Sequence, residues 1–157
     1  MSRVDTLPPA RYAVYVDVSA KLEQWHKPSA IAVANDHTRV LLVTAATKQA
    51  AARLLAHNPE PAQYILLATL TYLAVRPELE NLSSITLDQD YSGLVAERRI
   101  LRRLLHLLRQ DRPRLKASAL RMENIAGSRA DVLARAVYKG ASRPNRVVTL
   151  AEIERLL

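Results

Sequence analysis

Hydrophobic and polar positions divide the chain into short apolar runs first and longer helical patterns afterwards. The first run, at 12–19, is almost continuously apolar, which predicts a strand buried on both faces. Further apolar runs at 29–34 and 39–44 flank the polar residues 35–38, a pattern typical of two strands joined by a tight turn. We therefore expect the chain to begin with three antiparallel strands.

After these strands the apolar positions recur mostly with helical spacing. Proline, glycine and capping residues such as Thr47 and Ser128 set the expected boundaries. The pattern predicts helices at 47–56, 60–75, 93–110, 129–139 and 150–157, and strands at 82–88 and 117–125. The helix at 60–75 is apolar nearly all round, so we expect it to be buried against the sheet.

Composition limits the class of protein. The chain has 157 residues, 49% of them hydrophobic, which suits one domain at 1–140 followed by a linker and C-terminal helix at 141–157. It has no cysteine, which excludes disulfides, zinc-thiolate sites and cysteine nucleophiles. Neither a signal peptide nor an apolar run long enough to span a bilayer is evident, so we predict a cytoplasmic protein without a membrane partner.

Charge indicates a polyanionic partner. The formal net charge of +8 favours nucleic acid, because a positive field concentrates polyanions. The helix at 93–110 has an arginine-rich side suited to phosphates, and two lysines flank Trp25, which we expect to be a packing residue. The candidate nucleic-acid-binding residues are Arg98, Arg99, Arg102, Arg103, Arg109, Lys21 and Lys27.

Acidic residues lie where predicted strands end or a helix begins. Asp17 is near the end of the first strand, Asp88 and Asp90 follow the fourth, and Asp131 is in the first turn of a helix. A buried carboxylate needs a cation or several donors beside it. Alternatively, Asp131 complements a helix N-terminus, and Asp88 and Asp90 form a turn.

Three short segments resemble the ribonuclease H-like superfamily, and type 1 ribonuclease H most closely. The segment 17–19, Asp-Val-Ser, is similar to the Asp-Gly-Ser at that family's first metal ligand. The segment 87–91 looks like its Thr-Asp-Ser-Gln-Tyr, and 130–136 is close to its Asp-x-Leu-Ala-Arg-Ala run. The resemblance extends from residue 12 to about residue 139.

This resemblance implies an α/β fold in which helices flank a five-stranded mixed sheet, in the order β-β-β-α-β-α-β-α. It implies a two-metal nuclease that cleaves RNA in RNA–DNA hybrids, or structured DNA, with Mg²⁺ or Mn²⁺. Asp17, Asp88 and Asp131 would be the catalytic metal ligands, assisted by Asp90 or Glu60.

The sequence also departs from the family. Gln63 occupies the place of its helix glutamate, and the helix at 47–56 looks like an insertion. The alternative is therefore a domain of this fold that has lost catalysis and serves as a nucleic-acid-binding or interaction module. A third interpretation is a basic structural or assembly protein, such as a homodimer formed through the C-terminal helix.

Overall fold

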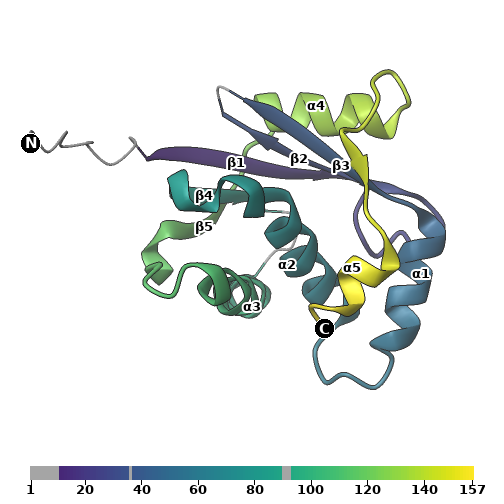
Figure 1. Ribbon diagram of the computed structural model, residues 1–157. Helices are drawn as coiled ribbons and strands as arrows, with labels where there is room; N and C mark the ends of the chain where they lie inside the picture. The colour runs from purple at the N-terminus through teal and green to yellow at the C-terminus, as the bar shows by residue number, and fades with distance from the viewer. Residues whose placement is uncertain (1–10, 36, 90–92) are drawn as a thin grey trace, which may run out of the picture.

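The computed structural model of the protein describes residues 11–35, 37–89 and 93–157, and it places a mixed sheet between helices (Figure 1). Within these residues the sheet has six strands in the order β5-β4-β1-β2-β3-β6. They are β1 (Tyr12–Ser19), β2 (Ser29–Ala34), β3 (Thr38–Val43), β4 (Leu82–Asp88), β5 (Leu120–Glu123) and β6 (Arg146–Val147). The expectation of five strands is wrong, because a short strand near the C-terminus extends the sheet beyond β3.

The strand pairing confirms the expected opening meander. β1 pairs antiparallel with β2, and β2 pairs antiparallel with β3. On its other side β1 pairs parallel with β4, which pairs parallel with β5. The carboxyl ends of β1, β4 and β5 therefore meet at one end of the sheet.

The helices agree with the predicted order, with different boundaries at several ends. They are α1 (Ala45–Leu54), α2 (Ala62–Val75), α3 (Leu94–Asp111), α4 (Arg129–Tyr138) and α5 (Leu150–Glu154). Helix α1 begins before Thr47, because the Thr44 hydroxyl accepts a hydrogen bond from the Thr47 backbone N–H at 3.2 Å and caps the helix. The predicted fifth strand is shorter than expected, since its first three residues form a 3₁₀ turn, η2 (Ala117–Ala119).

Two cores lie on opposite faces of the sheet. Alternate residues of β1, among them Val14 and Val16, face α2 and α3, and α2 is buried from Ile65 to Val75 as its apolar pattern predicts. The opposite core joins α4 to three alanines of β2: Ala30, Ala32 and Ala34. These small side chains let the α4 backbone approach the sheet closely, with Ala130 and Ala134 fully buried against them.

Residues after 140 pack on the same sheet. Asn145 exchanges hydrogen bonds with Val40: its backbone N–H donates to the Val40 carbonyl at 2.8 Å, and its side-chain oxygen accepts from the Val40 N–H at 2.7 Å. Val148 and Ile153 join the larger core, which places α5 beside α1. Among the described helices, none has the length and apolar character needed to cross a membrane.

Candidate functional site

Asp17 and Asp88 lie next to each other across the parallel strands β1 and β4. The last aligned pair is Val16 with Leu87, so each aspartate follows at the next position of its strand. Side chains alternate along a strand, and the Asp17 partner in β2 is Ala32, which packs against α4. Both aspartates therefore belong to the α4 face of the sheet, at the carboxyl ends of its central strands.

Asp131 reaches this place from the first turn of α4. Ser128 caps the helix by accepting the Asp131 backbone N–H at 3.2 Å, and the Asp131 carboxylate accepts the Gly127 N–H at 2.8 Å. Arg135, one turn later, lies 3.3 Å from the same carboxylate. The helix-capping role expected for Asp131 is therefore present in the structure.

The Asp131 carboxyl also lies near Asp17, close enough for Asp17 to lower the pKa of Asp131. The Gly127 N–H is the main cause that lowers the pKa of Asp131, with partial burial opposing it and Asp17 and Arg135 adding to it. Asp17 is 3% exposed, whereas the Asp131 side chain is 17% exposed, so the two carboxyls meet where the buried strand end reaches the surface. A shared proton or a cation would stabilise two such groups, because two ionised carboxylates in contact repel.

Asp88 is held by the loop that leads into α4. Its Oδ1 accepts the backbone N–H of Ile125 at 3.0 Å, and the neighbouring Gln89 N–H donates to the Glu123 carbonyl at 3.0 Å. Over the described ranges, no three acidic or histidine side chains are grouped closely enough to hold a metal ion. The structure thus joins Asp17 with Asp131 directly and places Asp88 beside them, bonded to the backbone.

The structure describes neither of the auxiliary ligand candidates, Asp90 and Glu60, as part of this cluster. Asp90 lies outside the described residues. Glu60, just before α2, faces Arg103 of α3 at 3.7 Å. Gln63 is in the first turn of α2, and Leu67, one turn later, lies beside Asp88. Gln63 therefore lies one helical turn before a residue that lines the same small hollow as Asp88.

The candidate nucleic-acid-binding residues differ in their exposure and in their bonding partners. Arg98, Arg99 and Arg102 are exposed along α3, whereas Arg103 faces Glu60 and the Arg109 Nε donates to the Leu115 carbonyl at 2.9 Å. Lys21 and Lys27 are exposed in the β1–β2 connection. Trp25, in the same connection, packs against the core as expected.

Lys48 is a residue that the sequence reasoning missed. Its side chain is fully buried under the β1–β2 connection, and its ammonium donates to the carbonyls of Gln24 and Lys27 at 3.0 and 2.9 Å and to the Ser29 hydroxyl at 2.8 Å. Burial lowers the pKa of Lys48 to about 8, against a smaller opposing effect of Glu23. The available signal was its spacing: Lys48 precedes the buried Ala51 by three positions, on the same side of α1.

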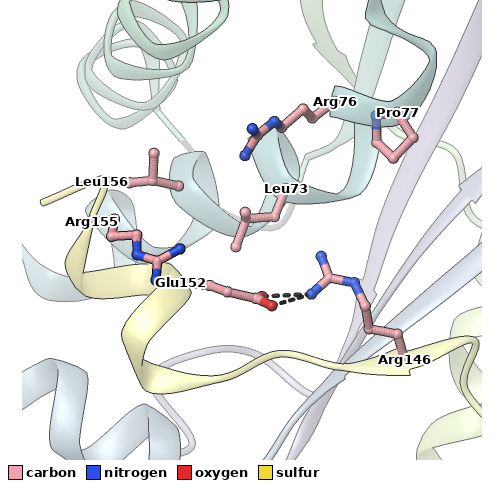
Figure 2. A pocket seen from close by; sticks show the side chains of 7 residues that line it. All are labelled: Leu73, Arg76, Pro77, Arg146, Glu152, Arg155 and Leu156. Carbon is pink, nitrogen blue, oxygen red and sulfur yellow. Dashed lines mark hydrogen bonds and ion pairs between the residues drawn. The ribbon is translucent and has the colours of Figure 1, made fainter.

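Two cavities also contain cationic side chains. The first, of about 470 Å³, is formed where α5 approaches the end of α2, and it is lined by Leu73, Arg76, Pro77, Arg146, Glu152, Arg155 and Leu156. Figure 2 shows Arg76 above the cavity, Arg155 at its left, and Arg146 at its lower right bonded to Glu152. The second, of about 370 Å³, lies at the amino ends of β1, β4 and β5.

Comparison of the chain with known protein families, with curated proteins and with solved structures finds no match.

Proposed function

We propose that the chain is a divalent-metal-dependent nuclease of the ribonuclease H-like superfamily, acting on RNA in RNA–DNA hybrids or on structured DNA. The observation that supports this proposal best is the contact between Asp17 and Asp131, with Asp88 beside Asp17 in the adjacent strand. These residues are far apart in the sequence, and each was expected to be a metal ligand. The net charge of +8 suits a nucleic-acid substrate.

The donor set fits Mg²⁺ or Mn²⁺, which prefer carboxylate oxygens. Asp17 and Asp131 would hold the ion, and Asp88 is the further carboxylate that could contribute an oxygen. A bound ion would supply a nucleophile by lowering the pKa of water and would stabilise charge on phosphate. The chain itself fixes both ends of the arrangement: the Gly127 N–H orients Asp131, and the Ile125 N–H orients Asp88.

Asp17→Asn tests the proposal, because the amide keeps the size of the side chain and removes its charge. We expect this variant to lose cleavage of labelled RNA–DNA hybrid, duplex DNA or a four-way junction in Mn²⁺, with an unchanged circular dichroism spectrum. EDTA should abolish the wild-type reaction. Glu154→Gln, an equal charge change on exposed α5, is the matched control and should cleave normally. Equal activity in Asp17→Asn and wild type would refute the assignment.

A second candidate function is nucleic-acid recognition without cleavage. Two features favour it: an amide, Gln63, occupies the helix position where the family has a glutamate, and Glu60 faces Arg103. In this case the protein binds nucleic acid with a steep salt dependence, and substitutions of Arg98 and Arg102 weaken binding while no metal-dependent cleavage occurs. Gln63→Glu separates the two candidates further, since a fourth carboxylate should strengthen Mn²⁺ binding in calorimetry if α2 faces a metal site.

A further inference from the structure

A basic cavity lies at the end of the sheet opposite the carboxylates. Arg11 precedes β1, Ser83 and Ser84 follow the first residue of β4, and Arg121 is in β5. The connection from α3 to β5 completes the lining with Arg112, Arg114, Leu115, Lys116, Ser118 and Ala119. Five cationic side chains and three serine hydroxyls thus surround about 370 Å³, and no carboxylate is among the lining residues.

The positive charge of this cavity is largely unneutralised. Of its five cations, Arg121 alone forms an ion pair within the described residues, with Glu123 at 3.8 Å, and both side chains are 54% exposed. Two acidic side chains, Glu80 and Asp111, line an adjoining hollow that shares Arg11, Arg112 and Arg114. The cavity at α5 differs in this respect, because Glu152 binds Arg146 within it. The excess positive charge at the amino ends of the strands therefore favours the binding of an anion.

The cavity wall is fixed by hydrogen bonds. The Arg112 Nη1 donates to the carbonyls of Leu79 and Leu82 at 3.1 and 2.6 Å, which holds the guanidinium over the start of β4. The Leu115 N–H donates to the Arg112 carbonyl at 3.1 Å and closes the turn after α3. A ligand that binds here would therefore meet the Arg112 guanidinium already held in place, which lowers the entropy cost of binding.

The cavity also shares a sheet face with the carboxylates. Ser84 and Asp88 lie four residues apart on β4, on the same side, at about 3.3 Å per residue, or about 13 Å in all. Helix α4 covers β1, β2 and β3, whereas Arg121 on β5 stays exposed on that side. Tyr15, 44% exposed, lies between the two ends on β1.

We propose that the basic cavity is a binding site for a phosphomonoester or diphosphate group, either of a free phosphate compound or at the end of a nucleic-acid strand. Arginine binds phosphate oxygens through paired N–H groups, and serine hydroxyls donate to the remaining oxygens. A group with two or more negative charges matches the excess of cations better than the single charge of an internal phosphodiester. The site binds this group whether or not the distant carboxylates catalyse hydrolysis.

The test compares two triple variants of equal charge. Arg114→Gln, Lys116→Gln and Arg121→Gln together remove three exposed cations from the cavity. Arg53→Gln, Lys139→Gln and Arg143→Gln remove three exposed cations elsewhere. Calorimetry measures the affinity for pyrophosphate, and fluorescence anisotropy measures the affinity for a single-stranded oligonucleotide with a 5′-phosphate or a 5′-hydroxyl, all at fixed salt and with EDTA present.

We expect the cavity triple variant to bind pyrophosphate at least about tenfold more weakly than wild type, while the control triple variant changes little. Pyrophosphate binding without an effect of the 5′-phosphate identifies a free phosphate compound as the ligand. Tighter binding of the 5′-phosphorylated strand, lost in the cavity variant alone, identifies a strand end. Equal weakening in both triple variants, or no pyrophosphate binding by wild type, overturns the proposal. None of these outcomes depends on cleavage, so failure of the nuclease assignment is distinguishable.

Discussion

Replacing Lys48 by methionine removes a buried ammonium group and keeps most of the apolar stem. Three charge-assisted hydrogen bonds are lost, to Gln24, Lys27 and Ser29. Each such bond contributes roughly 1.5–3 kcal/mol. Burial of the ammonium opposes them, since the fall of the Lys48 pKa from 10.5 to about 8 corresponds to about 3 kcal/mol. We therefore expect Lys48→Met to lower the free energy of unfolding at pH 7 by about 1.5–6 kcal/mol.

The lowered pKa of Lys48 also predicts how the stability difference between wild type and Lys48→Met changes with pH. Below pH 8 the amine is protonated in both the folded and the unfolded state, so its contribution to stability is constant. Above pH 8 the folded protein releases the proton while the unfolded chain keeps it up to about pH 10.5, so the stability contributed by Lys48 rises. Between pH 7 and 9.5 the gap between wild type and Lys48→Met should widen by about 2 kcal/mol.

Urea denaturation at pH 7, 8.5 and 9.5, followed by circular dichroism, measures this gap. Lys139→Met, an equal charge change at an exposed lysine, is the control and should differ from wild type by less than about 0.5 kcal/mol at each pH. A gap for Lys48→Met that stays constant with pH would show that the three acceptors fully offset the cost of burial. A gap below about 1 kcal/mol at pH 7 would refute a structural role for the hydrogen bonds.

Three further substitutions probe other parts of the fold. Asp131→Asn should cost about 1 kcal/mol at pH 7 in urea denaturation, because it weakens the bond to Gly127. The lowered Asp131 pKa means that this cost disappears as the pH falls below about 3.8. Asn145→Ala should cost about 1 kcal/mol and speed hydrogen exchange of the Val40 amide, and unchanged exchange would contradict it. Ala20→Gly should raise the melting temperature, since Ala20 has a φ of 64°, and a lower one would show that backbone entropy outweighs strain.

Continuous apolar runs made part of the fold predictable. β1, β2 and β4 have the expected bounds, because each coincides with a run of mostly apolar residues. Only β2 is buried along its whole length, since Ala13 and Tyr15 of β1 and Ser83 of β4 are exposed. β6 could not be predicted, since its two residues, Arg146 and Val147, are exposed and gain their strand geometry from the edge of β3. A pairing between segments that are far apart in the chain produces no periodic pattern of hydrophobic and polar residues from which the strand could be predicted.

Part of the candidate site could also be predicted, because the sequence shows where strands end and helices begin. Asp17 and Asp131 were found from their places at a strand end and a helix start, and the structure brings them into contact. The partner of Glu60 could not be read from the sequence, since Arg103 reaches it through the packing of α3 on α2. Lys48 was missed because a lysine in an alanine-rich helix is ordinarily exposed, and its acceptors are backbone carbonyls that carry no sequence signal.

The pairing of β6 with β3 has a consequence for the growing chain during translation. Val40 and Asn145 are separated by 105 positions, so the outer edge of β3 stays open until most of the sheet has been synthesised. An open edge presents unpaired N–H and C=O groups to other chains and promotes aggregation. Nascent chains stalled before Asn145 should therefore depend on chaperones more strongly than chains in which β6 has emerged from the ribosome.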